Sequence, residues 1–157
     1  MSVIEIIGYL TLIEVILKED KDKPMEVIET LAFSKLKEEK WEVALEIYDL
    51  LSNIKGIQES DRLLYQINCW QCYKWLGKYD QVKDSISKKD ISLIPTSYKL
   101  CIHALKDEFE EFFKLLKSEY DICKDTIDLE EWPIFREVRK KEEYEKFKVI
   151  DVEPCLD

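Results

Sequence analysis

The 157-residue sequence contains only three glycines and four prolines. Folds built from many short strands and turns need more of both, and disordered chains hold fewer apolar residues than the 46% found here. The composition therefore predicts an all-α protein. A chain of this length buries enough surface for one self-sufficient core, so we expect a single domain over residues 1–150 and a loose tail at residues 151–157.

Positive charge is also scarce. Lys and Arg total 24 against 34 Asp and Glu, and the formal net charge is −10. Such a chain repels a nucleic-acid backbone and an anionic membrane, so we expect neither as a partner, and a polar partner should be basic. Glutamates interleave with the one basic cluster and weaken it as an anion site. That cluster is Arg136, Arg139, Lys140 and Lys141.

Long apolar runs are limited to the N-terminal region. Residues 3–18 are mostly apolar, but Glu5 and Glu14 interrupt them and no basic residue leads them, so they predict a buried helix rather than a targeting or membrane segment. The five cysteines are an odd number without a signal-peptide pattern, which favours reduced thiols. We therefore expect a cytoplasmic protein.

Helical periodicity predicts about 8–10 helices along the chain. Proline suits the first position of a helix, and glycine suits the residue that follows one. The expected helices after the first cover residues 24–38, 41–54, 61–76 and 79–89, a segment restarting at Pro95, a segment from Phe109 to Leu116, a short segment within 119–132, one opening at Pro133 and one containing Tyr144 and Phe147.

A recurring pattern marks where one helix turns into the next. An aromatic residue opens the second helix of each expected hairpin, and an apolar residue follows three positions later. The spacings between these aromatics are 38, 30 and 35 residues, which scatter around a period of 34. The four pairs are Trp41 with Ala44, Tyr79 with Val82, Phe109 with Phe112, and Tyr144 with Phe147.

This pattern resembles the tetratricopeptide repeat family, in which a Gly-x-Tyr elbow precedes a small residue. Gly77-Lys78-Tyr79 matches the elbow, and Ala44 matches the small residue. Leu31-Ala32 matches the Leu-Gly pair that the family carries earlier in the repeat. The resemblance covers residues 24–148 and implies a TPR-like α-solenoid of stacked antiparallel hairpins. The repeats are degenerate, because larger residues replace the small one in the later copies. A generic helical bundle is the rival interpretation.

The resemblance also implies a concave groove that binds a protein or peptide. Asn68 falls at a family position that often hydrogen-bonds a ligand backbone, and Lys74 can pair with a ligand carboxylate. An ordinary solvated face is the alternative. The implied groove residues are Glu29, Phe33, Lys37, Asn68, Gln71, Lys74, Trp75 and Tyr98.

The cysteines offer a second interpretation, a metal or redox site. Cys69 and Cys72 form a CxxC pair, and adding Cys101 and His103 would complete a tetrahedral zinc site. However, Cys101 and His103 are two residues apart and do not share a helix face. A redox pair needs its first cysteine at a helix N-terminus, whereas this pair lies mid-helix. Buried thiols that only pack are the simplest explanation.

Sequence motifs for common catalysis are missing. The chain has no glycine-rich phosphate loop, no HExxH and no GxSxG, so we predict no enzyme and no cofactor. The predicted function is a non-enzymatic interaction module or a regulatory or inhibitory subunit, for example an immunity- or antitoxin-like protein acting on a basic partner, alone or within a larger complex. The alternative is a metal- or redox-dependent protein that uses the Cys/His cluster.

Overall fold

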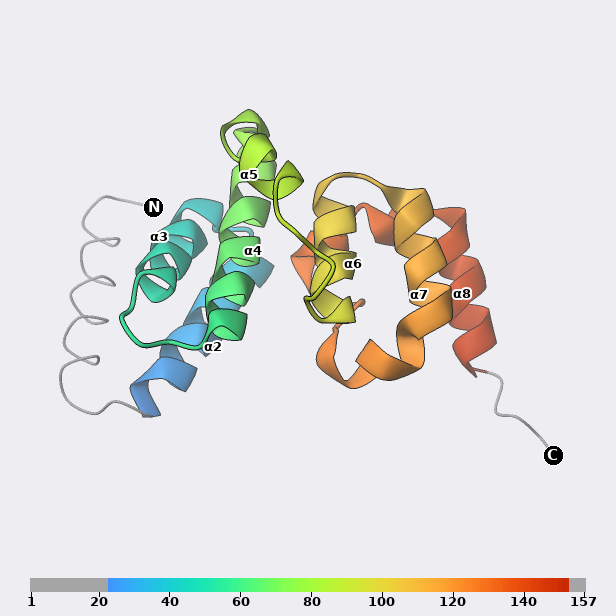
Figure 1. Cartoon of the computed structure of the whole chain (residues 1–157), viewed down its shortest axis with the longest axis horizontal. Coiled ribbons are helices and arrows are strands. Elements are labelled where there is room, and N and C mark those ends of the chain that lie inside the picture. The colour runs from blue at the N-terminus through green and yellow to red at the C-terminus, as the bar shows by residue number, and fades with distance from the viewer. Residues whose placement is uncertain (1–22, 153–157) are drawn as a thin grey trace. The chain divides into compact units, whose positions relative to one another are not determined.

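The computed structural model describes residues 23–152 and the side chains of residues 25–148 (Figure 1). The described residues are helical and contain no strand, which confirms the all-α class. The expected helix at 3–18 lies outside them, and so does the tail from residue 153 onward, whereas residues 151 and 152 belong to the last helix. The described part also holds no helix that combines the length and apolar character needed to cross a membrane.

Contacts divide the chain into two compact units, Met1–Gly77 and Lys78–Asp157. We call them the N-terminal and the C-terminal unit and describe each by itself. The boundary falls inside the Gly77-Lys78-Tyr79 elbow that the sequence predicts for the second hairpin. Each unit has its own set of buried apolar side chains.

Three long helices form the described part of the N-terminal unit: α2 (Lys23–Lys37), α3 (Trp41–Ser52) and α4 (Glu59–Trp75). They correspond to the expected helices at 24–38, 41–54 and 61–76. Connections are short, so consecutive helices run antiparallel, and α3 contacts both α2 and α4. A helix that touches two neighbours needs two apolar faces. Accordingly, α3 buries Trp41, Val43, Ala44, Ile47, Tyr48 and Leu51.

Aromatic pairs join α3 to α4 at both ends. The Trp41 and Trp75 rings lie 6.4 Å apart between centroids, and the Tyr48 and Tyr65 rings lie 6.2 Å apart. Apolar residues of α2 complete this core at Ile28, Ala32 and Leu36. Because Ala32 and Ala44 are small and fully buried, α2 and α3 can approach closely, as the repeat pattern predicts.

The C-terminal unit is less regular. It begins with a 3-10 turn, Tyr79–Gln81, and a short helix, α5 (Lys83–Ser87). Two longer helices follow, α6 (Thr96–Leu105) and α7 (Phe109–Cys123), then 3-10 turns at Lys124–Thr126, Pro133–Phe135 and Val138–Lys140, and finally α8 (Glu142–Val152). The helices expected at 79–89 and from Pro133 are therefore wrong in length or type. The short helix expected within 119–132 is replaced by the end of α7 and one 3-10 turn.

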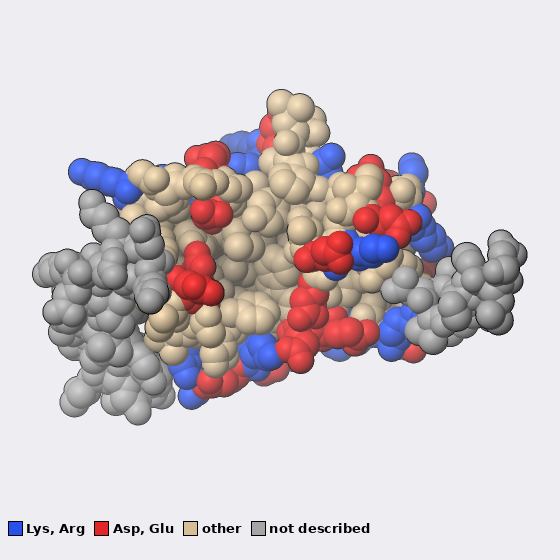
Figure 2. Space-filling model, turned by 90° about the horizontal axis from the view of Figure 1, so that it is seen from below, with Lys and Arg blue, Asp and Glu red and all other residues tan. Residues whose placement is uncertain are grey.

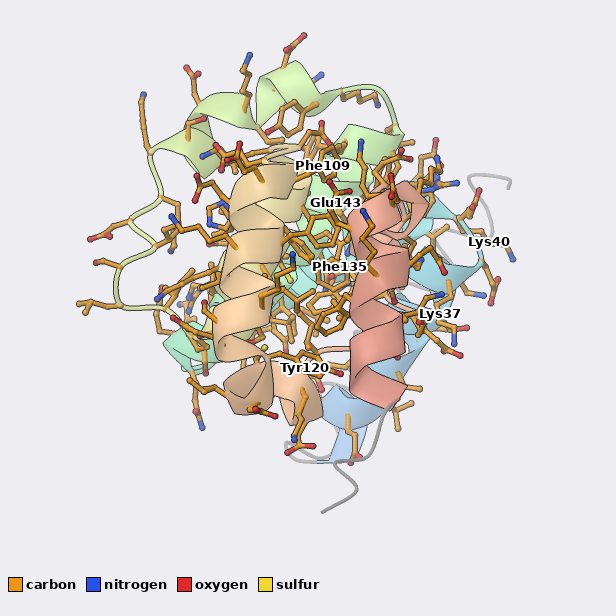
Figure 3. The ribbon with its side chains drawn as sticks, turned by 90° about the vertical axis from the view of Figure 1, so that its right-hand side faces the viewer. Lys37, Lys40, Phe109, Tyr120, Phe135 and Glu143 are labelled. Atoms are coloured by element: carbon orange, nitrogen blue, oxygen red, sulfur yellow. The ribbon has the colours of Figure 1, made fainter. Side chains whose placement is uncertain are left out.

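Aromatic side chains fill the space between α7 and α8. Figure 3 shows Phe109, Phe135 and Tyr120 along the gap between these two helices. Phe112 is fully buried, and its ring centroid lies 5.3 Å from that of Phe113 and 5.7 Å from that of Phe135. The short segment after Pro133 is thus held by its aromatic contacts, because its few residues cannot sustain a helix by backbone hydrogen bonds alone.

Three elbows share one backbone feature, a residue with positive φ two positions before the aromatic. The angle is 58° at Glu39, 70° at Gly77 and 58° at Asp107. At the first and third elbows the next amide closes the helix on the carbonyl five residues earlier: Lys40 N donates to Lys35 O at 2.9 Å, and Glu108 N donates to His103 O at 3.0 Å. The fourth expected copy lacks this turn, since Glu142, two positions before Tyr144, already belongs to α8 and does not have a positive φ.

Candidate interaction surface

One stripe of α2 carries three of the expected groove residues. Met25, Glu29, Phe33 and Lys37 follow each other at intervals of four, so they lie on one side of the helix. We call this row the α2 ridge. Met25, Glu29 and Phe33 are half-buried and Lys37 is exposed. The Lys37 ammonium lies 6.0 Å from the centroid of the Phe33 ring, within range of a cation–π interaction.

The C-terminal end of α4 offers a second aromatic residue next to a lysine. The Lys74 ammonium lies 5.5 Å from the Trp75 ring centroid, and both side chains are half-buried. Trp75 rests against Trp41 on its other side. Because α2 and α4 both run antiparallel to α3, they are parallel to each other, and the two Lys-aromatic pairs occupy the same ends of their helices.

Asn68 and Gln71 do not contribute to an exposed surface, which corrects the expectation for both. Asn68 is 3% exposed and Gln71 is fully buried. Gln71 Nε2 donates to Asn68 Oδ1 at 2.6 Å, so the two amides satisfy each other in part. Gln71 Oε1 is buried without a hydrogen-bond partner among the described residues. The physical reason is that α4 is buried on more than one face, so a polar residue on it need not reach solvent.

Tyr98, the last expected groove residue, lies in the C-terminal unit on the first turns of α6. It is half-buried and lines an open pocket of about 410 Å³ with Ile94, Pro95 and the exposed Ile122. Thr96 in the same pocket donates to Glu119 Oε2 at 2.5 Å. The pocket is thus mainly apolar, with hydroxyl groups at its edge.

A different pocket lies at the start of the α2 ridge. Its volume is about 470 Å³, and Met25 and Glu29 of α2, Asp61 and Tyr65 of α4 and the loop between α3 and α4 line it. The Tyr65 hydroxyl donates to Glu29 Oε1. Sequence reasoning placed Glu29 on the surface but missed its neighbours. The four-residue spacing identifies Met25 in retrospect, whereas the loop residues carry no such signal.

The described cysteines are buried, apart from the half-buried Cys69, and their thiols resist ionisation. Burial raises the pKa of Cys69 to about 12 and raises that of Cys72 further, and it raises the pKa of Cys101 well above its usual value. A nucleophile or metal ligand must be a thiolate, which such surroundings disfavour. Among the described residues no three His, Cys, Asp or Glu side chains gather in a way that would hold a metal ion.

His103 belongs to an ionic cluster at the elbow between α6 and α7. Its Nδ1 lies 2.8 Å from Glu108 Oε2, and Lys106 Nζ lies 2.5 Å from Glu108 Oε1. Burial acts to raise the pKa of Glu108, but hydrogen bonds from Lys106 and His103 outweigh it, so the pKa is lowered. This arrangement ties the last turn of α6 to the first residue before α7, which is a structural role.

No protein-family model matches the chain, and neither a curated protein nor a solved structure matches it significantly.

Proposed function

We propose that this chain is a non-enzymatic interaction protein of helical hairpins, a regulatory or inhibitory subunit that holds a protein or peptide partner. The observation that carries the proposal is the recurrence of one elbow. Glu39 and Asp107 lie 68 residues apart, twice the period of 34, and have the same φ of 58°. Helical-hairpin repeats have no catalytic centre of their own and act by presenting extended surfaces.

The binding surface in this proposal is the α2 ridge together with the end of α4. Half-exposed aromatic rings beside flexible lysines suit partner recognition, because aromatic side chains contribute much of the binding energy at protein interfaces. Phe33 and Trp75 are the aromatic anchors, with Lys37 and Lys74 as their charged neighbours. These lysines suit a carboxylate or carbonyl group of the partner.

The overall charge supports a basic partner for the rest of the surface. The net charge is −10, and the four cysteines of the described residues are free thiols. We therefore place the protein in the cytoplasm as an acidic partner of a basic protein, in the manner of an immunity protein or antitoxin. A negative charge of this size speeds association with a basic effector, and salt weakens that attraction.

Capture from an extract of the native host tests the proposal. The purified chain is immobilised, and bound proteins are identified by mass spectrometry against a double variant, Lys37→Ala with Lys74→Ala. The control is Lys88→Ala with Lys114→Ala, which removes the same charge from exposed positions of the C-terminal unit. We expect the ridge variant to retain about three- to fivefold less partner, because an exposed ion pair is worth up to about 1 kcal/mol, while the control retains it fully.

Thermal midpoints of all three proteins should agree, since none of these lysines fills the core. Equal capture by both variants would place the binding surface elsewhere on the molecule. If the wild-type chain captures no specific protein, the interaction function is wrong.

A further inference from the structure

We propose that the pocket at the start of the α2 ridge accepts a lysine or arginine side chain from a basic segment of the partner. The inference rests on the proposed function and specifies the chemistry of the partner. We call this site the ridge pocket and define it by Met25, Glu29, Ile54, Ile57, Asp61 and Tyr65. It lies wholly within the N-terminal unit.

The walls of the ridge pocket are apolar. Met25 comes from α2, while Ile54 and Ile57 come from the loop between α3 and α4, and all three side chains are half-buried. Gly56 has φ +84°, which allows this loop to fold back against the helices. The stem of a lysine or arginine is a chain of methylene groups that packs well on such side chains while its charged head reaches polar groups.

Two carboxylates, those of Glu29 and Asp61, also line the pocket. Glu29 accepts the hydroxyl of the buried Tyr65, which fixes the position of its carboxylate. For Asp61 the described part of the chain provides one side-chain hydrogen-bond contact, from the Ser60 hydroxyl at 3.5 Å from Oδ1. Neither carboxylate forms an ion pair with a cation among the described residues. Within the described residues, the site therefore has two carboxylates that form no ion pair, and hydrogen bonding holds the carboxylate of Glu29 in place.

The nearby cations do not cancel this charge. Arg62 follows Asp61 in the sequence, but its guanidinium contacts other groups. Its Nη1 donates to Ser52 O at 2.5 Å, and its Nε lies 3.5 Å from Glu59 Oε2. Lys55 is exposed and also lines the pocket, which leaves one net negative charge on the lining at neutral pH.

The pocket's surroundings agree with a cationic guest. The first turns of α4 and the loop before it lie at the lower side of the N-terminal unit in Figure 1, the side that Figure 2 displays. There, acidic side chains stand among uncharged residues, with some basic side chains toward the edges of the view. A basic segment meets attraction at the pocket and from the whole chain, whose net charge is −10.

A titration with single-residue probes tests the ridge pocket directly. Backbone amide shifts of the ¹⁵N-labelled full chain are followed by NMR while N-acetyl-lysine amide or N-acetyl-arginine amide is added. N-acetyl-norleucine amide, which keeps the stem without the charge, is the comparison probe. We expect the two cationic probes to shift amides at residues 25–29, 54–58 and 61–65. They should bind about three- to fivefold more strongly than the neutral probe, because an exposed ion pair is worth up to about 1 kcal/mol.

Matched variants assign the effect to the two carboxylates. Glu29→Gln with Asp61→Asn should weaken cationic-probe binding by about three- to fivefold, on the same scale of ion-pair energies. Glu42→Gln with Glu46→Gln removes the same charge from exposed positions of α3 and should leave binding within about twofold, since exposed surface charges act only weakly at a distance. Unshifted pocket amides, scattered shifts, or equal binding of the neutral probe would overturn the proposal.

The same variants separate this inference from the broader function. If the captured partner is retained equally by the wild-type chain and by the Glu29→Gln, Asp61→Asn variant, the interaction function stands and the ridge pocket is not where a basic side chain binds. If the probes bind at the pocket as expected but the chain captures no specific protein, the pocket chemistry stands and the proposed function fails.

Discussion

The elbow between α2 and α3 and the elbow between α6 and α7 have nearly the same backbone but different sequences. Lys40 has φ −86° and ψ 65°, and Glu108 has φ −82° and ψ 66°. Each follows a residue with φ 58° and precedes an aromatic. Neither elbow has glycine, the residue that favours positive φ, at this position. The turn therefore follows from the reversal of the helix direction and not from the residue type.

The elbow at Gly77 shares the positive φ of the other two elbows, but no long helix follows it directly. It has the left-handed residue and the aromatic Tyr79, yet only a 3-10 turn and the short helix α5 follow. After Tyr79 this segment buries only Val82 and Ile86, whereas α7 buries Phe112, Phe113 and Leu116. A turn thus permits a hairpin, but the length of the apolar stripe decides how far the second helix runs.

The largest expected effect comes from the aromatics at these elbows. Trp41 is 9% exposed and contacts Trp75, so Trp41→Ala should reduce the free energy of unfolding by about 3–5 kcal/mol. Tyr79 is only half-buried, so Tyr79→Ala should cost about 1 kcal/mol. Urea denaturation followed by far-UV circular dichroism measures both. Equal costs would show that the two elbows are packed alike.

Substitutions at the positions with positive φ should change the free energy of unfolding by a smaller amount. Introducing glycine there should raise it, and removing glycine should lower it. Glu39→Gly and Asp107→Gly relieve a side chain at φ 58° and should each stabilise the chain by up to about 1 kcal/mol. Gly77→Ala should cost about 1 kcal/mol, because its φ is 70° and the added Cβ meets no atom within 4 Å, so only the backbone is strained.

The control for this prediction is Glu46→Gly, at an exposed position inside α3, which should destabilise by about 1 kcal/mol. Thermal unfolding of the four variants distinguishes relief of backbone strain by glycine from the ordinary cost of glycine inside a helix. Destabilisation by Glu39→Gly or Asp107→Gly of the same size as Glu46→Gly would mean that these elbows gain nothing from glycine's backbone freedom.

Much of the fold was predictable because periodicity acts locally. The boundaries of α2, α3 and α4 follow from apolar spacing, from Pro24 and from Gly77. The segment after Pro133 was not predictable, because Phe135 is buried against the ring of Phe112 in α7 rather than by a helical stripe of its own. Pattern reasoning interprets such a segment as a helix.

The candidate surface was predictable only in part. The resemblance placed Glu29, Phe33 and Lys37 together. Their four-residue spacing puts them on one side of any helix that covers this segment. It failed at Asn68 and Gln71, because a family position says which way a side chain points but not what covers it. The ridge pocket depends on how the loop before α4 closes, which no local pattern encodes.

The smallest expected effect is the pH dependence of the stability that Glu38 contributes at the first elbow. Glu38 receives hydrogen bonds from Lys40, Lys35 and Ser34, in that order of importance, and they lower its pKa from 4.5 to about 2. A carboxylate with a lowered pKa in the folded state contributes stability above its unfolded pKa and loses that contribution as the pH falls through its folded pKa. The thermal midpoint of Glu38→Gln should therefore lie slightly below that of the wild-type chain at pH 7.

This difference should shrink between pH 4.5 and pH 2, because the wild-type carboxylate becomes protonated over that interval. It should also shrink at high salt, since Glu38 is exposed to solvent. Glu46→Gln is the control, because Glu46 is an exposed acidic residue of α3 with no ion pair among the described residues, and its midpoint should differ from the wild-type value equally at both pH values. A Glu38→Gln difference that persists unchanged at pH 2 would show that the Lys40 and Lys35 contacts do not stabilise the elbow through charge.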